Sequence, residues 1–326
     1  MEFDRAVKPP VNKSTRPLTC AVMLPTHNRV DELRRTLSVL SRLEPPPDEI
    51  LITADACTDR TKQFIRTSFP TARLIVNTTP RGATASRDAM AREARSDLLL
   101  SIDDDSYPLE PDAIARLREI FSQRPRLAVA SFPQRSDEFP ETLTATDFGS
   151  GHFAGSYVNC ACAFRRQVLV GLGGHFGAFW NAYDEADFSV RCASAGWQVR
   201  FEPGITIRHH YSGVNRNELR VHQMHARNEL WSVLMRCPAP QLFAVALFRA
   251  ARQLGYAWER GLSWTVREPQ WWLAFCRGLP RCLRERAPLP WRSYVEWMRL
   301  VRQPIASDDE WHARFGGGDA LEERRK

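Results

Sequence analysis

Short apolar runs alternate with amphipathic stretches along the first 130 residues. The apolar runs have the length and content of buried strands, and they predict strands at 19–24, 49–54, 73–77, 98–102 and 127–132. Between them, apolar residues recur at helical spacing, which predicts helices at 31–43, 58–69, 83–95 and 111–123. We expect Pro25 to end the first strand and Pro70 to close the second helix. Strands that alternate with helices indicate right-handed crossovers and a mainly parallel sheet.

The alternation stops at residue 136 and returns near residue 159. The stretch between them is rich in Gly and Ser, which predicts a flexible loop region. Further on, the pattern predicts strands at 159–164, 198–201 and 206–208 and helices at 166–172, 185–195 and 216–236. The remaining chain reads as amphipathic helices broken by prolines. The predicted fold is therefore α/β, with a Rossmann-like, mixed but mainly parallel sheet flanked by helices and a C-terminal helical extension.

Three acids, Asp103, Asp104 and Asp105, directly follow the strand predicted at 98–102. Adjacent carboxylates repel one another, and a hard divalent cation such as Mg²⁺ or Mn²⁺ relieves that repulsion. Ligands of open α/β sheets bind beyond the carboxyl ends of the strands. The triple Asp is therefore interpreted either as part of a cation site or as a solvated acidic turn before the next helix.

Polar clusters also follow the first three predicted strands, at 25–29, 55–59 and 81–88. Any one of them is an ordinary polar turn. Together with the triple Asp, they make four polar clusters on one rim of the sheet, which indicates a ligand with a base, a ribose and phosphates.

The charge of the chain is unevenly distributed. The net charge is +7 over 326 residues, and 43% of the residues are hydrophobic, as in an ordinary globular protein. Twelve Arg, no Lys and four Glu give residues 236–303 a net charge of +8, and eight of the ten Trp lie from Trp231 onward. This segment is interpreted either as helices packed on the catalytic domain or a second subunit, or as a membrane-associated surface. Nucleic acid is not an expected partner, because no binding motif is present.

The cysteines and the N-terminal segment indicate the cellular compartment in which the protein is expected. The eight cysteines form no CxxC pair, which favours buried thiols in a reducing compartment. No apolar stretch has the length of a membrane span, and the N-terminal segment lacks the apolar core of a secretory signal. The expected location is the cytoplasm, with the inner face of the membrane as an alternative.

The order of these motifs resembles that of family 2 glycosyltransferases, which are inverting enzymes of the GT-A fold that use nucleotide-diphospho-sugars. The matching segments are Pro-Thr-His-Asn-Arg at 25–29, Asp55 and Asp59, Arg-Gly at 81–82, Arg-Asp at 87–88, the triple Asp, Asp-Glu-Ala-Asp at 184–187 and Arg-His-His at 208–210. The resemblance covers roughly residues 18–235. No G-x-G-x-x-G dinucleotide fingerprint competes with it.

The resemblance implies roles for individual residues. It implies a metal site of Asp103, Asp105 and His209, and a general base at Glu185 with Asp184 as the alternative. The implied donor-binding residues are Pro25, Thr26, Asn28, Arg29, Asp55, Arg81, Gly82, Arg87, Asp103 and Asp104.

For Arg87 and Asp187, a structural role is an alternative to a role in the active site. Arg87 is interpreted either as a diphosphate ligand or as part of a solvated helix start. Asp187 lies four residues before Arg191 on the same predicted helix, so we expect the two to pair.

Four segments are expected. Residues 1–17 form a flexible N-terminal segment, 18–235 the catalytic domain, 236–315 a basic, aromatic helical extension and 316–326 a disordered tail. Within the catalytic domain, 18–105 would bind the nucleotide-sugar and 106–235 would form the acceptor side. The helical extension would support peripheral membrane association or a homo-oligomer.

The expected function is a divalent-metal-dependent, inverting transfer from a UDP-, GDP- or dTDP-sugar to an acceptor hydroxyl, in glycan, polysaccharide or glycoconjugate biosynthesis. One alternative is a sugar nucleotidyltransferase, but the turn at 25–29 is not the Gly-rich basic loop that such an enzyme needs. Another is a non-catalytic sugar-nucleotide-binding protein. The triple Asp and Glu185 argue against it.

Overall fold

The computed structural model describes residues 16–211 and 217–316. Most of the N-terminal segment and of the C-terminal tail for which flexibility was expected, and the expected helix start at residue 216, lie outside the described residues.

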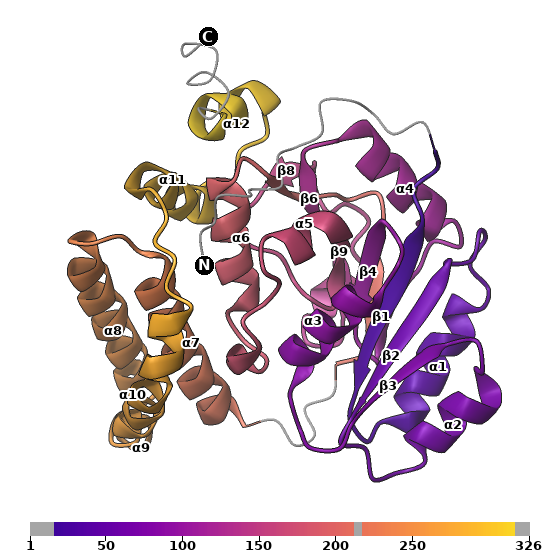
Figure 1. Ribbon diagram of the computed structural model, residues 1–326, viewed down its shortest axis with the longest axis horizontal. Coiled ribbons are helices and arrows are strands. Elements are labelled where there is room, and N and C mark those ends of the chain that lie inside the picture. The colour runs from indigo at the N-terminus through magenta and orange to yellow at the C-terminus, as the bar shows by residue number, and fades with distance from the viewer. Residues whose placement is uncertain (1–15, 212–216, 317–326) are drawn as a thin grey trace.

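Eight strands form the central sheet of the described chain, in the order β3-β2-β1-β4-β9-β6-β10-β8 (Figure 1). Strand β9 runs antiparallel to both of its neighbours, and β8 runs antiparallel to β10, whereas the other pairs are parallel. The predicted mixed but mainly parallel sheet is therefore confirmed. The strands are β1 Cys20–Thr26, β2 Glu49–Asp55, β3 Arg73–Asn77, β4 Leu98–Ile102, β6 Leu127–Ser131, β8 His152–Phe153, β9 Ala161–Arg165 and β10 Gln198–Phe201.

Helices cover both faces of this sheet (Figure 1). Alternate residues of β1 enter two separate cores: Val22 packs with α1 and α4 on one face, and Met23 packs with α3, α5 and α6 on the other. The covering helices are α1 Val30–Leu40, α2 Thr61–Ser68, α3 Ala83–Glu93, α4 Ala113–Gln123, α5 Arg166–Gly171 and α6 Asp184–Ser194.

A second, three-stranded sheet begins with β5 Ser106–Pro108, which follows β4 after the triple Asp. It has the order β5-β11-β7, with β7 Gln134–Ser136 and β11 Ile207–His209. Two expectations are corrected here. Strand β1 continues through Pro25 to Thr26, because a parallel partner holds both residues in register. The expected loop region at 136–157 contains β8 and the 3₁₀ helix η1 Pro140–Leu143, which are too short to give a periodic signal.

The C-terminal third is helical, as predicted. Helix α7 lies between α6 and the pair formed by α8 and α10 (Figure 1). Within residues 16–211 and 217–316, no helix combines the length and the apolar content that crossing a bilayer requires. The helices of this part are α7 Glu218–Arg236, α8 Gln241–Glu259, α9 Leu262–Thr265, α10 Glu268–Arg284, α11 Trp291–Arg302 and α12 Asp308–Phe315.

A buried charge cluster joins α6 to α7. Asp187 is fully buried and pairs with Arg191 at 3.1 Å and with Arg236 at 3.0 Å, and it accepts a hydrogen bond from Ser232. The expected pairing of Asp187 with Arg191 is confirmed. Burial alone would raise the pKa of Asp187, but the charges of Arg236 and Arg191 outweigh burial and lower it. The cluster fixes the helix that carries Asp184 and Glu185 against the C-terminal helices.

Replacing Asp187 with asparagine is expected to lower the free energy of unfolding by about 3–5 kcal/mol, because two buried guanidinium groups lose their carboxylate. Urea unfolding at neutral pH measures the loss. The matched control is Asp112→Asn, which removes a half-exposed carboxylate paired with Arg116 and should change stability very little. Equal stability of the two variants would contradict the role given to Asp187.

Candidate active site

Three segments that lie far apart in the sequence meet at the end of β4. The triple Asp follows β4 directly, Cys160 precedes the antiparallel neighbour β9, and β11 places His209 opposite Ser106. As a result, Asp103, Cys160 and His209 each offer a ligand atom, and these atoms lie within 4.8 Å of one another. We call these three residues the metal-ligand cluster. Of the expected metal site of Asp103, Asp105 and His209, the structure brings Asp103 and His209 together with Cys160, which sequence reasoning did not include.

Asp103 has a cationic partner within the protein. It pairs with the guanidinium of Arg87, which also donates to Ser101 Oγ at 3.1 Å. Arg87 is buried, so its interpretation as part of a solvated helix start is wrong. The side chain of Asp103 remains about one third exposed, at 34%. It is therefore accessible to a ligand from solvent.

Asp104 and Asp105 share the guanidinium of Arg29, but their pKa values shift in opposite directions. Arg29 donates to Asp104 at 3.0 Å and to Asp105 at 2.7 Å, and Thr26 Oγ1 also donates to Asp104. Burial raises the pKa of Asp104 to about 7. Burial would also raise the pKa of Asp105, but the neighbouring His209 and Arg29 outweigh burial and lower it. His209 Nε2 lies 3.5 Å from Asp105 Oδ1, so Asp105 borders the metal-ligand cluster as an ionised carboxylate.

Asp55, at the end of β2, holds the loop that leads to α3. Its carboxylate accepts hydrogen bonds from the backbone N–H groups of Arg81 and Gly82, each at 2.9 Å, and from Asn77 Nδ2 at 2.8 Å. Gly82 has a φ of +84°, and a Cβ there would lie 2.7 Å from the carbonyl oxygen of Trp180. Only glycine fits this position. The loop presents the exposed side chain of Arg81 at the same edge of the sheet.

The turn after β1 is tied to the turn after β2. Asn28 has a φ of +54°, and its Oδ1 accepts hydrogen bonds from the backbone N–H groups of Thr58 and Asp59 at 2.7 and 3.2 Å. Pro25 lies inside β1, next to Thr26. These two turns therefore form one continuous rim beside the triple Asp.

Two adjacent carboxylates begin α6, and they have different surroundings. Asp184 is buried and accepts hydrogen bonds from Thr84 Oγ1 at 3.1 Å and Asn159 Nδ2 at 2.9 Å. Glu185 is half-buried. Burial and the adjacent carboxylate of Asp184 raise the pKa of Glu185 well above its usual range. Asp184 is thus anchored, whereas Glu185 has an increased affinity for a proton.

The thiol of Cys160 links this pair electrostatically to the metal-ligand cluster. Its pKa is raised well above the usual value, first by burial and then by the charges of Asp103, Asp105 and Glu185. One thiol therefore lies within the field of all three carboxylates. The acids that begin α6 also approach the cluster through the chain itself, because Asp184 accepts a hydrogen bond from Asn159, the residue before Cys160.

Helix α7 fixes the loop that leads into α6. Asn228 Nδ2 donates to the carbonyl oxygens of Phe179 and Ala182 at 2.7 and 2.8 Å. Both Trp180 and Tyr183 in this loop have positive φ, at +67° and +69°. Such a backbone persists only where its surroundings hold it in place. Asn228 was not a predicted site residue. Its Nδ2 holds the main chain of the loop, and its Oδ1 accepts a hydrogen bond from Arg227 Nε at 2.9 Å.

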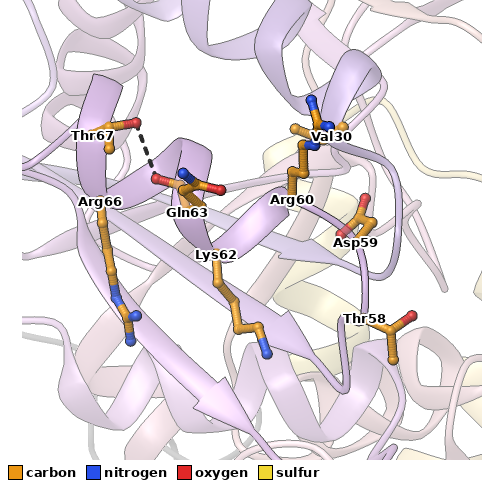
Figure 2. A pocket seen from close by; sticks show the side chains of 8 residues that line it. All are labelled: Val30, Thr58, Asp59, Arg60, Lys62, Gln63, Arg66 and Thr67. Carbon is orange, nitrogen blue, oxygen red and sulfur yellow. Dashed lines mark hydrogen bonds between the residues drawn. The ribbon is translucent and has the colours of Figure 1, made fainter.

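A separate depression of about 800 Å³ lies beside α2 (Figure 2). Its lining joins the rim through Thr58 and Asp59, whereas Lys62 and Arg66 extend together on another side. It contains neither the triple Asp nor Glu185. The lining residues are Val30, Thr58, Asp59, Arg60, Lys62, Gln63, Arg66 and Thr67. We assign the depression no part in the chemistry.

Comparisons with known proteins agree with one another. The family model described as "Glycosyl transferase family 2" matches residues 21–188, slightly more than half of the chain. An "Uncharacterized glycosyltransferase" of Haemophilus influenzae is 27% identical over 124 residues, which covers 38% of this chain and 42% of that protein. The chain thus aligns with less than half of this curated relative.

Two solved structures are similar in fold. A mannosyltransferase of Pyrobaculum calidifontis, PcManGT, in complex with GDP-Man and Mn²⁺, has a TM-score of 0.53 and 19% identity, covering 92% of this chain and 90% of that one. GalNAc-T7 with UDP, GalNAc and Mn²⁺ has a TM-score of 0.56 and 13% identity, covering 69% of this chain and 49% of that one. The expected GT-A architecture is confirmed.

Proposed function

This chain belongs to glycosyl transferase family 2, and from this premise we propose that it transfers a sugar from a nucleotide-diphosphate donor to an acceptor hydroxyl with inversion. One observation carries the proposal. Glu185, a half-buried carboxylate with a raised pKa, directly follows Asp184, and Asp184 is hydrogen-bonded to Asn159, the residue before Cys160 of the metal-ligand cluster. An inverting transfer needs a proton acceptor on one side of the sugar and stabilisation of the leaving group on the other.

The donor would lie along the rim formed by the turns after β1, β2 and β3. Arg81 offers an exposed guanidinium, whose planar fork matches the oxygens of a diphosphate. Asp103 is the acid of the triple Asp with the most accessible carboxylate. The nucleotide complexes of the two similar structures support a nucleotide-sugar as donor.

A divalent cation fits the metal-ligand cluster. Its three ligand atoms converge within 4.8 Å, and Asp105 Oδ1 nearby is buried without a hydrogen-bond partner among the residues that the structure describes. A set of oxygen, nitrogen and sulfur ligands favours Mn²⁺ over Mg²⁺, which prefers oxygen alone. When bound, the cation would act as a Lewis acid that stabilises the negative charge of the departing diphosphate.

The protein's own groups would carry the proton. Glu185 takes the proton of the acceptor hydroxyl while that oxygen forms its bond to the anomeric carbon. The bond from this carbon to the donor's phosphate oxygen breaks, and its electron pair leaves with the diphosphate. The carboxylate of Asp184, held by Thr84 and Asn159, lies beside Glu185 and raises the affinity of Glu185 for the proton.

Thermal unfolding with UDP, GDP and dTDP tests the donor site. We expect one nucleotide to raise Tm in the presence of Mn²⁺ and to lose that effect with EDTA. A ligand at 100 times its Kd stabilises the folded state by about 2.7 kcal/mol, so the shift is readily measured. Hydrolysis of a panel of the corresponding nucleotide sugars then identifies the sugar. A shift of equal size with and without metal would contradict the cation site, and no shift with any nucleotide would contradict the donor site.

A further inference from the structure

Helix α8 exposes its apolar side chains. Phe243, Leu247 and Trp258 have exposed fractions of 75%, 73% and 69%, and Phe248 and Leu254 follow at 56% and 49%. At 3.6 residues per turn, these five positions fall within about 140° of the helix circumference. The other residues in that arc are Ala244, Ala251 and Gly255, so the arc contains no charged side chain.

The inward side of α8 carries a polar network. Arg249 and Arg252 pair with Glu229 of α7 at 3.0 and 2.6 Å, and Gln253 also donates to this carboxylate. Glu229 is fully buried. Leu242, Val245 and Ala246 of α8 also pack inward against a buried core. The helix is therefore apolar on both sides, whereas a surface helix normally has a polar outer side. The ion pairs to Glu229 fix the rotation of α8, so the helix cannot roll to bury its exposed apolar side without leaving a buried charge unpaired.

Helix α9 extends the apolar surface. Leu262 and, directly after the helix, Val266 have exposed fractions of 71% and 64%. We call Phe243, Leu247, Phe248, Leu254, Trp258, Leu262 and Val266 the α8–α9 face. Helix α8 lies beside α10 at the end of the molecule farthest from β3 (Figure 1). The α8–α9 face is thus remote from the sheet and its site.

The exposed charge of these helices indicates the kind of partner. Arg267, directly after α9, and Arg277 and Arg284 of α10 are exposed and form no ion pair within the described chain, whereas Glu259 is the one exposed carboxylate of residues 241–284. A second copy docked here would bring two positively charged surfaces together, whereas anionic lipid headgroups complement them. Exposed Trp, Phe and Leu beside a basic rim are typical of helices that lie in the interface of a bilayer. We propose that the α8–α9 face docks onto the surface of an anionic lipid bilayer.

Flotation of the full chain with vesicles tests this proposal. We expect flotation with vesicles that contain phosphatidylglycerol, much weaker flotation with phosphatidylcholine alone, and a loss of binding at high salt. Leu247→Glu and Trp258→Glu should each reduce partitioning by about tenfold or more. The matched control is Phe139→Glu, at a residue that is 54% exposed outside this face, which should float like the unmodified chain.

Two further measurements separate the outcomes. Each variant should keep the Tm of the unmodified chain and its nucleotide-induced Tm shift. An unchanged Tm shows that the variant is folded, and an unchanged shift shows that its donor site is intact. Sedimentation of the chain without vesicles reports a second copy as occupant. The proposal is overturned if the chain does not float, if Leu247→Glu floats equally well, or if the chain is a dimer that Leu247→Glu separates while no vesicle binds.

Discussion

Replacing Glu185 with glutamine is expected to lower kcat by about 10²–10⁴-fold, which is the usual contribution of a general base. Glutamine keeps the size of the side chain but cannot accept the proton of the acceptor hydroxyl. The donor site is formed by other elements, so the nucleotide-induced Tm shift should be unchanged. Initial rates with the best donor of the panel, together with thermal unfolding, measure both effects. Glu119→Gln, on the exposed side of α4, is the matched control and should leave kcat unchanged.

The pH dependence of activity is an independent test of Glu185 as the general base. A general base must be unprotonated, and burial together with Asp184 raises the pKa of Glu185. Activity should therefore rise with pH through this raised pKa, with an acidic limb of kcat/KM above the ordinary glutamate value of about 4.3. Asp184→Asn removes the neighbouring negative charge, so the limb should move to lower pH. If Asp184→Asn abolishes turnover while Glu185→Gln does not, Asp184 is the base instead.

The parallel half of the sheet was predictable from the sequence. The predicted strands at 73–77 and 98–102 have the bounds of β3 and β4, because buried parallel strands are continuous apolar runs and the helices between them have their own period. The strands β5, β7 and β8 have two or three residues each. They depend on partners far along the chain, such as the bridge between Phe153 and Ile305. Local patterning carries no such signal.

The residues of the candidate site that follow parallel strands were predictable, because the carboxyl ends of parallel strands lie at one edge of the sheet. Asp55 and the triple Asp reach the site in this way. Cys160 does not, because β9 is antiparallel and brings the residue before its amino end to that edge. Arg29 was expected to bind the donor, and its two ion pairs with Asp104 and Asp105 depend on side-chain packing that no spacing rule contains.

Replacing His209 with alanine is expected to remove the Mn²⁺-dependent part of the nucleotide-induced Tm shift. It should also lower kcat/KM by about 10³-fold, which corresponds to several kcal/mol of Lewis-acid stabilisation. His209 is one of the three residues of the metal-ligand cluster, and its ring borders Asp105. Nucleotide titrations with Mn²⁺, Mg²⁺ or EDTA, followed by Tm, measure the loss. A variant that keeps a full Mn²⁺-dependent shift would exclude His209 as a ligand.

A comparison of Cys160→Ser with Asp105→Asn shows which of these two residues binds the cation together with Asp103 and His209. If Cys160 binds the cation, Co²⁺ bound by the unmodified chain should show a thiolate-to-metal absorption band, and Cys160→Ser should lose that band and shift the preference toward Mg²⁺. Cys276→Ser, at the exposed cysteine of α10, is the matched control and should keep the band. If Asp105→Asn weakens Mn²⁺ binding and Cys160→Ser has no effect, the cation is held by Asp103, Asp105 and His209. The thiol then has a structural role, as a hydrogen-bond donor to Gln134 Oε1 at 3.3 Å.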